Sequence, residues 1–257
     1  MTISITAIHA LLTRYWLEYS QVWKLLLLRD VADRLIFLFA FGYGMGAIVR
    51  TMDGTSYFSF IVPGLMCSSP MMTMTLAMTF GIYERYKSTQ IWQSWLATPV
   101  KLPEIMLSEL IYANLRSLPA VFVMLAIALL LGELPNPWGI VPLLPIIILA
   151  NMAYGAVAMC FTTHATRTMH FAFVQTFWMM PMYLFSGVFF DITQTPAWMQ
   201  TVANIYPLTH ILKISRPLLL GQPLDLQTLI VSVSILTLTF ILAFTYALYR
   251  FNKKLRS

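Results

Sequence analysis

Residues 229–249 read LIVSVSILTLTFILAFTYALY, an unbroken stretch without a single charged side chain. A helix needs roughly 20 residues to cross the hydrocarbon core of a membrane, which is about 30 Å thick, and this stretch is long enough. Five further predominantly apolar blocks precede it, at residues 31–49, 57–80, 111–132, 138–161 and 171–190. Lipid offers backbone amides no hydrogen-bond partner, and the alternating pattern of a membrane barrel is missing, so each block is predicted to be helical. The sequence therefore predicts an all-α, polytopic membrane protein with six transmembrane helices.

The composition and the placement of charge agree with a membrane protein. The chain is 59% hydrophobic and 10% charged, with a mean hydropathy of +0.74, which excludes an ordinary soluble domain. Its net charge of +6 does not indicate a nucleic-acid partner, because the basic residues are sorted by side. With a cytoplasmic N-terminus, all but three of the 16 lysines and arginines fall in or beside cytoplasmic segments, the exceptions being Arg50, Lys213 and Arg216. Six spans return the C-terminus to the cytoplasm, so both termini are predicted there.

The segments at both ends of the six-span core can be assigned from their side-chain pattern. Residues 1–29 place apolar side chains at helical spacing with polar ones between them, which predicts an amphipathic helix lying at the cytoplasmic interface. A soluble helix packed on a partner is the alternative. Residues 30–249 form the core, and residues 250–257 are a basic cytoplasmic tail that anchors the last span. We expect residues 1–257 to form a single transmembrane domain.

The outer segment after the fifth span is too short for another span and too apolar for an ordinary loop. Pro196 and Pro207 each stand at the start of an apolar stretch, and Gly221 is placed to end the second one. We therefore expect two short helices here, either interfacial or re-entrant into the outer leaflet.

Between the second and third spans lies the one sizeable polar stretch on the cytoplasmic side, YERYKSTQIWQSWLATP at residues 83–99. Ile91, Trp92, Trp95 and Leu96 are at helical spacing, and Pro99 ends the pattern. A short helix with this apolar face must bury it against the bilayer or against a soluble partner.

The residue patterns of catalysis and metal binding are missing from the sequence. No G-x-x-x-x-G-K-[ST] phosphate loop occurs, so the energy for any transport must come from another chain. The histidines are scattered without metal-ligand spacing, and no carboxylate lies at mid-membrane. The carboxylates that lie near span ends or in loops are Glu84, Glu104, Glu109, Glu133, Asp191 and Asp225. We therefore predict no catalytic residue, no metal site and no cofactor bound by this chain.

Two stretches resemble the signature regions of type-2 ABC exporter permeases. The first is ER at residues 84–85 followed by QIWQSWLATP at 90–99, and the second is LFSGVFF at 184–190, continued by PAW at 196–198 and YPLTH at 206–210. The resemblance covers nearly the whole chain, because the spans, the N-terminal helix and the outer short helices occur in that family in the same order. Within the family, the sequence is most similar to permeases related to nodulation-factor exporters, which carry lipid-linked oligosaccharides.

The resemblance implies partners and a coupling element. Such permeases lie in the bacterial inner (cytoplasmic) membrane, pair as homodimers and bind two copies of a separate ATPase subunit, which holds ATP and Mg²⁺. The segment 84–99 would then fit a cleft on that ATPase. Its predicted coupling residues are Glu84, Arg85, Tyr86, Ile91, Trp92, Trp95, Leu96 and Pro99.

The same resemblance implies a path for the substrate along the first, second and fifth spans. Aromatic side chains on these spans could stack on sugars or contact acyl chains, although membrane packing is the better explanation for each of them taken singly. The predicted path residues are Phe37, Phe41, Tyr43, Phe177, Tyr183 and Phe185.

The function that we expect is a permease subunit that moves a lipid-linked saccharide or a similar amphipathic lipid outward. A permease of the same family that exports a drug-like hydrophobe is one alternative. A membrane-embedded transferase acting on lipid-linked sugars is another, and it would require a cluster of carboxylates or histidines facing a headgroup. Growth in toxic hydrophobes with and without the gene, set against surface-glycolipid composition, separates the first two functions. Substrate turnover by the purified chain without an ATPase would support the third.

Overall fold

The computed structural model describes residues 4–49, 51–52 and 54–256, and these are almost entirely helical, as the sequence predicts. The only strands among them are β1 (Thr51–Met52) and β2 (Thr55–Ser56), an antiparallel pair in which Thr51 faces Ser56. Arg50, predicted on the outer side, lies outside the described residues, as do residues 1–3 of the predicted interface helix and Ser257 of the predicted tail.

Four described helices are long and apolar enough to cross a membrane, and they match the predicted second, third, fourth and sixth spans. The second span is α3 (Tyr57–Leu76), which continues through the π-helical turns η2 (Ala77–Gly81) and η3 (Glu84–Ser88). The third is α5 (Leu102–Leu130), and the fourth is η4 (Pro137–Gly139) with α6 (Ile140–His164). The sixth is α11 (Leu226–Arg256). The chain is therefore a multi-pass membrane protein.

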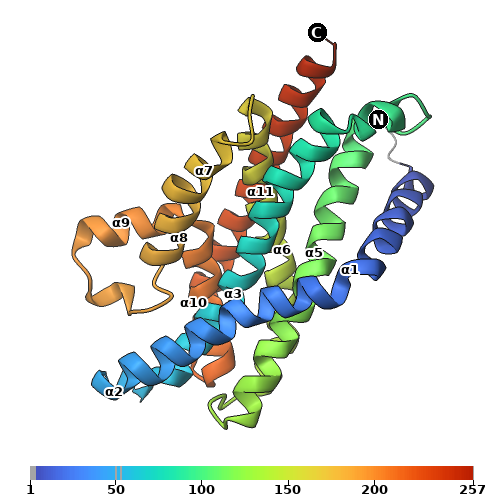
Figure 1. Cartoon of the computed structure of the whole chain (residues 1–257). Helices are drawn as coiled ribbons and strands as arrows, with labels where there is room; N and C mark the ends of the chain where they lie inside the picture. The colour runs from blue at the N-terminus through green and yellow to red at the C-terminus, as the bar shows by residue number, and fades with distance from the viewer. Residues whose placement is uncertain (1–3, 50, 53, 257) are drawn as a thin grey trace.

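The predicted first span is helical but is not a separate element. It lies at the end of α1 (Ile5–Phe39) and in the turns that follow, η1 (Ala40–Met45) and α2 (Gly46–Ile48). The expected interface helix of residues 1–29 and the expected first span thus belong to one long helix, which changes direction along its length (Figure 1). It is not among the four helices of membrane-crossing length and hydropathy.

The predicted fifth span is shorter in the structure than in the prediction. It consists of α7 (His170–Val174), η5 (Gln175–Met179) and α8 (Met180–Phe185). Residues 186–190 are not helical, because Gly187 has a φ of 87° and turns the chain away from the helix axis. The prediction of a helix to residue 190 is therefore wrong by five residues. The count of six spans stays a prediction, with four of them matched by helices of sufficient length.

Helix α3 is the centre of the bundle and packs against α1, α5, α6 and α10. It contains Pro63 and Pro70 yet remains helical from Tyr57 to Leu76. Threonine side chains further along donate hydrogen bonds to backbone carbonyls, from Thr75 Oγ1 to Met71 O at 2.8 Å and from Thr79 Oγ1 to Thr75 O at 2.7 Å. Such local bonds satisfy polar groups inside an apolar environment. In contrast, only 11% of the most apolar window of α11 is buried, so this helix lies at the periphery.

The two predicted outer helices are present. After the short turn η6 (Ile192–Gln194) come α9 (Ala197–Ile205), capped by Pro196, and α10 (Pro207–Leu220), which ends at Gly221 with a φ of 71°. Helix α10 packs against α3, α6 and α11, so it enters the bundle rather than lying on its surface.

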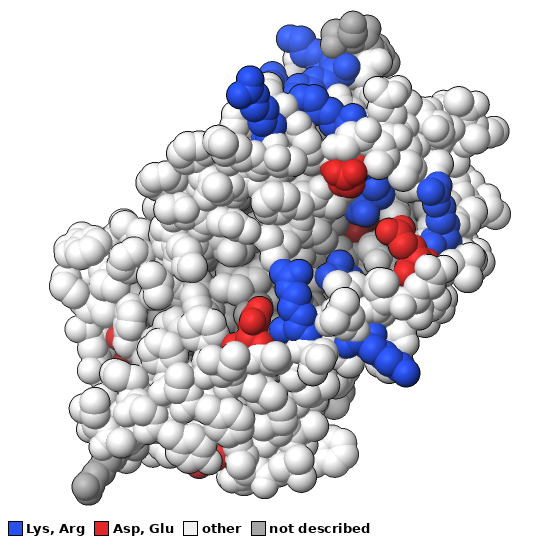
Figure 2. Space-filling model, in the orientation of Figure 1, with Lys and Arg blue, Asp and Glu red and all other residues white. Residues whose placement is uncertain are grey.

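The charges are distributed unevenly along the molecule. Figure 2 shows lysine and arginine side chains at the end where the C-terminus lies and across the middle of this face, while the opposite end carries almost none. The positive-inside rule predicts that the basic side faces the cytoplasm, and the orientation of the termini stays a prediction.

Close packing of α3 against the chain after α8 yields a first prediction. A Cβ atom on Gly64 would lie 2.9 Å from the Val188 carbonyl oxygen, so Gly64→Ala requires the backbone to move and is expected to destabilise the fold by about 1–3 kcal/mol. Gly44→Ala is the matched control, because nothing lies within 4 Å of its Cβ position. Thermal unfolding of the purified protein, followed by tryptophan fluorescence, measures both. Equal midpoints for the two variants would contradict the close approach.

Candidate coupling site

The predicted coupling segment forms a compact elbow between α3 and α5. The helix that begins as α3 ends at Ser88, and the chain then reverses at Gln90, whose φ of 54° is in the left-handed region. The short helix α4 (Ile91–Leu96) follows, as the sequence predicts. The Thr98 hydroxyl donates to the Trp95 carbonyl at 2.6 Å. Lys101 is the N-cap of α5, and its backbone amide donates to Glu104 Oε2 at 2.8 Å. The elbow is thus closed by hydrogen bonds at each bend.

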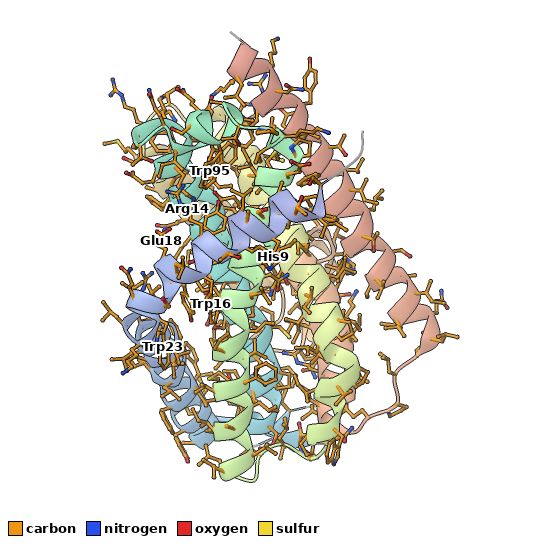
Figure 3. The ribbon with its side chains drawn as sticks, turned by 90° about the vertical axis from the view of Figure 1, so that its right-hand side faces the viewer. His9, Arg14, Trp16, Glu18, Trp23 and Trp95 are labelled. Carbon is orange, nitrogen blue, oxygen red and sulfur yellow. The ribbon has the colours of Figure 1, made fainter. Side chains whose placement is uncertain are left out.

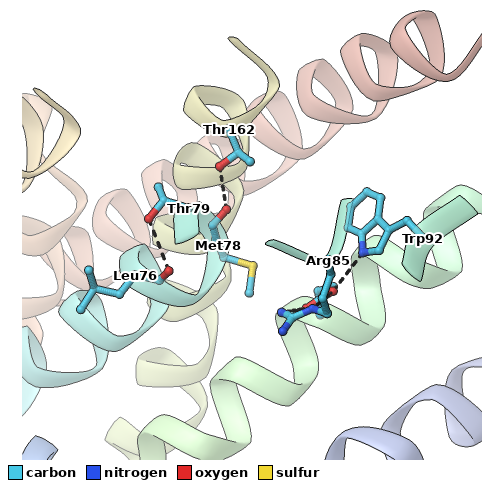
Figure 4. Close-up of polar contacts among 7 residues, drawn as sticks. Leu76, Met78, Thr79, Arg85, Trp92 and Thr162 are labelled. Atoms are coloured by element: carbon cyan, nitrogen blue, oxygen red, sulfur yellow. Dashed lines mark hydrogen bonds and ion pairs between the residues drawn. The ribbon is translucent and has the colours of Figure 1, made fainter. Parts of the chain in front are cut away.

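A buried carboxylate lies inside the elbow. Glu109 on α5 has 0% of its surface exposed and accepts hydrogen bonds from Arg85 Nε at 2.7 Å and from Arg85 Nη2 at 2.5 Å. It also accepts one from Trp92 Nε1 at 3.1 Å, so both donors point at the same acceptor group (Figure 4). Arg85 and Glu109 make the one salt bridge found among the described residues. A bidentate pair of this kind fixes both the distance and the orientation of its partners.

The indole of Trp92 connects the elbow to the last helix. It is fully buried, and its ring centroid lies 5.1 Å from Phe251 of α11 and 5.7 Å from Tyr86. Tyr86 and Phe251 also contact each other, at 5.3 Å. The three rings form a cluster between α4, η3 and the C-terminal end of α11.

The N-terminal half of α1 covers the other side of the elbow. Tyr15 packs edge-on against Trp95 at 5.8 Å, and the guanidinium groups of Arg14 and Arg85 lie over Trp95 and Tyr15 at 4.9 and 5.4 Å. Figure 3 shows Arg14 beside Trp95, with α1 crossing the bundle. The Ser4 amide donates to Glu104 Oε1 at 2.7 Å, so the first turn of α1 is tied to the start of α5.

The expectation that the apolar face of α4 meets the bilayer or a partner is wrong for its two indoles. Trp92 and Trp95 are buried against α1, α5 and α11 of the same chain. Among the other predicted coupling residues, Glu84 and Pro99 are exposed, and Arg85, Tyr86, Ile91 and Leu96 are half-buried. The outward face of the elbow is polar, and its exposed side chains are Glu84, Lys87, Ser88, Thr89, Gln90, Gln93, Ser94, Ala97, Thr98 and Pro99.

Three of the predicted path aromatics come together. Phe37 stacks on Phe41 at 5.9 Å and meets Tyr183 edge-on at 5.9 Å. Phe189, which the sequence reading did not select, joins them at 4.7 Å from Phe41 and 5.0 Å from Tyr183. We call these four rings the aromatic cluster. It joins α1 and η1 to α8 and the turn that follows.

The remaining path residues lie elsewhere. Tyr43 contacts Phe39 and Phe58, at 5.9 and 5.3 Å, and Phe185 is half-buried. Phe177 is 71% exposed and stacks on Phe173 beside a separate cavity of about 410 Å³. Phe177 is therefore not part of the aromatic cluster.

Glu109 and Phe251 belong to the packed interior of the elbow but are not among the predicted coupling residues. Glu109 was placed among carboxylates near span ends, and its partner Arg85 lies on another helix. No short-range spacing connects the two residues, or Trp92 with Phe251, so only the packing of the helices reveals them.

The fold and the elbow together define a multi-pass membrane protein whose elbow carries a polar outward face. Comparison with known sequences specifies the class. The family described as "ABC-2 type transporter" matches residues 6–220, and the chain belongs to this family. It is accordingly a membrane subunit of an ABC exporter, a type of subunit that transports rather than catalyses and that works with a partner ATP-binding subunit.

Several curated proteins are similar to this chain over most of its length. Nodulation protein J of Rhizobium meliloti (strain 1021) is 33% identical over 82% of this chain and 80% of its own. Nodulation protein J of Bradyrhizobium diazoefficiens is 29% identical over 94% of this chain and 91% of its own. The inner membrane transport permease YadH of Escherichia coli (strain K12) is 24% identical over 79% of each chain.

The buried ion pair yields a second prediction. Glu109→Leu leaves the Arg85 guanidinium inside the protein without its counter-charge, which is expected to cost about 3–5 kcal/mol of stability. The double variant Arg85→Met with Glu109→Leu removes both charges and is expected to recover most of that loss. Thermal unfolding midpoints of the single and double variants measure the difference. A double variant that is no more stable than Glu109→Leu would show that the pair does not carry the stability of the elbow.

Proposed function

We propose that this chain is the permease subunit of an exporter that moves a lipid-linked saccharide outward across the bacterial inner membrane. A separate ATPase subunit binds ATP and Mg²⁺ and drives the transport. The observation that carries the proposal is the structure of the elbow. Its outward face is polar, and it lies on a buried frame of aromatic and charged side chains, namely Arg85, Trp92, Glu109 and Phe251. A contact surface of this construction suits a soluble partner that must transmit force to the membrane helices.

The elbow is suited to transmission because its frame reaches several helices at once. A partner that displaces the outward face around Glu84 and Gln93 also displaces α4. Trp92 of α4 contacts both Glu109 of α5 and Phe251 of α11, so the displacement reaches these helices. Through Trp95 and Tyr15, the same displacement reaches α1. Packed interiors transmit such displacements because they are nearly incompressible.

The proposed substrate class rests on the aromatic cluster and on the relatives. Flat rings can stack on the faces of sugar rings and also contact acyl chains, so they suit a molecule with both parts. Phe37 and Phe41 lie on α1 and η1, and Tyr183 lies on α8, which agrees with a path between the first and fifth predicted spans. Several relatives carry the printed name "Nodulation protein J". The resemblance of the sequence to nodulation-factor exporters supports a lipid-linked saccharide as the proposed cargo.

The proposed assembly is a homodimer of this chain with two ATPase subunits. The end of α1 and the turns after it expose large apolar side chains, with Ile36, Phe39 and Ile48 among them. These side chains suit lipid or the same surface of a second copy. A symmetric pair would also present two elbows, one for each ATPase.

A third prediction concerns the outward face of the elbow. The double variant Glu84→Arg with Gln93→Arg alters charge only at exposed positions and is expected to weaken co-purification of the ATPase about tenfold or more. Thermal stability and membrane insertion should stay unchanged, because neither side chain belongs to the buried frame. Gln194→Arg, at an exposed position in the outer segment, is the control and should retain the ATPase. Full ATPase recovery with wild-type export by the double variant would refute the coupling role.

A fourth prediction separates the predicted path residues from one another. Phe41→Ala removes two ring contacts of the aromatic cluster and is expected to lower the export rate about tenfold, while Phe177→Ala should leave it near the wild-type value. Export is measured with proteoliposomes that contain the permease, its ATPase and a fluorescent lipid-linked saccharide. Equal losses in the two variants would contradict a path through the cluster.

A further inference from the structure

One charged side chain lies inside the predicted third span, Arg116 of α5. It is about 21 Å beyond the start of α5 at Leu102, at a rise of about 1.5 Å per residue. A cation among apolar side chains in a membrane is costly, so such residues pair with an opposite charge or with a hydrogen-bond acceptor. Arg116 is half-buried and makes no hydrogen bond or ion pair with any residue that the structure describes. A partner from outside the chain would remove this cost.

Part of the Arg116 guanidinium group is open to such a partner. Its Nε atom is buried, without a hydrogen-bond partner in the described part of the chain, and no ligand reaches that atom. The two Nη atoms also lack a partner among these residues, but they are not buried and keep accessible surface. Most N–H donors of an arginine are on its Nη atoms, so Arg116 retains donors that can bind a ligand.

Arg116 lines two cavities of about 470 Å³ each. The first, which we call the basic cavity, lies between α1, α5 and the helix formed by α3 and η2, and Arg29 also lines it. The second, which we call the apolar cavity, lies between α1 and α5, and its wall includes Leu12, Trp16 and Leu115. The two cavities therefore share one arginine side chain.

The basic cavity carries two cations and, among the described residues, no carboxylate. Its second cation, Arg29, is an exposed side chain of α1. The one salt bridge in the described part of the chain joins Arg85 to Glu109, so no described carboxylate neutralises either cation of the cavity. Two guanidinium groups without a counter-charge favour an anionic ligand, and their forked N–H donors match the oxygens of a phosphate group.

The position of the cavities favours a lipid as the source of the phosphate. Trp16 and Trp23 of α1 are 62% and 42% exposed, and Figure 3 shows both along the part of α1 that crosses the bundle. Exposed indoles gather at the headgroup level of a membrane, where phospholipid phosphates also lie. The apolar cavity beside Arg116 can take an acyl chain, which a free phosphate ion lacks. A phospholipid would thus use both cavities, and a phosphate ion only the basic one.

From these observations we infer that Arg29 and Arg116 bind the phosphate of an anionic phospholipid, with one of its acyl chains in the apolar cavity. An anionic phospholipid fits better than a zwitterionic one, because an ammonium headgroup would lie beside two cations and no described carboxylate. The bound lipid would join α1 to α3 and α5. This inference is independent of the proposed function, since it needs neither the cargo nor the ATPase.

The test is lipid binding to the purified, delipidated full-length protein, measured by native mass spectrometry, which resolves each bound lipid molecule. The probes are dioleoyl phosphatidylglycerol and, as the zwitterionic comparison, dioleoyl phosphatidylethanolamine. The first phosphatidylglycerol is expected to bind roughly tenfold more tightly than phosphatidylethanolamine, because two cations attract its net charge. The double variant Arg29→Gln with Arg116→Gln should weaken phosphatidylglycerol binding roughly tenfold or more, through the loss of two charged donors, and should bring the two lipids to similar affinities.

A matched control separates this site from general charge attraction. The double variant Lys24→Gln with Lys253→Gln removes the same net charge from exposed positions that line neither cavity. It should keep the wild-type preference for phosphatidylglycerol. An equal loss of affinity in the two double variants, or no preference in the wild-type protein, would overturn the inference.

Two further measurements decide the source of the phosphate and the fold of the variants. Inorganic phosphate should not displace bound phosphatidylglycerol, and displacement at equal concentration would assign the site to free phosphate and overturn the lipid assignment. In phosphatidylethanolamine alone, Arg116→Gln should unfold at the wild-type temperature or above it, because no partner within the chain is lost. A lower unfolding temperature would show that Arg116 has a partner inside the protein and would refute the site.

Discussion

The Glu109 carboxylate, buried and held by Arg85 and Trp92, is the interaction on which the basic end of this protein depends. A carboxylate in an apolar interior is tolerated only with a counter-charge and hydrogen bonds, so these three side chains must stay together. They come from η3, α4 and α5, and that requirement defines the path of the chain through the elbow. Trp92 then extends the same constraint to Phe251 of α11.

The packing inside the elbow explains why its outward face is polar. Its apolar side chains are used internally, against α1, α5 and α11, and the side chains left outside are short, polar or charged. A polar surface on a rigid frame suits a partner that associates from water.

Much of the architecture follows from local sequence signals. The apolar blocks at 57–80, 111–132, 138–161 and 229–249 correspond to α3, α5, α6 and α11. An apolar stretch of that length in lipid must form all its backbone hydrogen bonds internally, so it is helical. The positions of Pro196, Pro207 and Gly221 predicted the bounds of α9 and α10 correctly, because proline and glycine restrict the backbone at their own positions. The predicted helix through residue 190 was wrong, because a positive φ at Gly187 outweighs the apolar side chains around it.

Hydropathy and backbone chemistry act within a few residues, so the sequence by itself determined the all-α class, the membrane location and the elbow helix. Which side chains meet was decided by tertiary structure. The indoles of α4 looked available to a partner, yet α1 and α11 cover them, and Glu109 acquires its role only when α3 and α5 bring Arg85 beside it. These contacts join helices that are distant along the chain, and no spacing within a single helix encodes them.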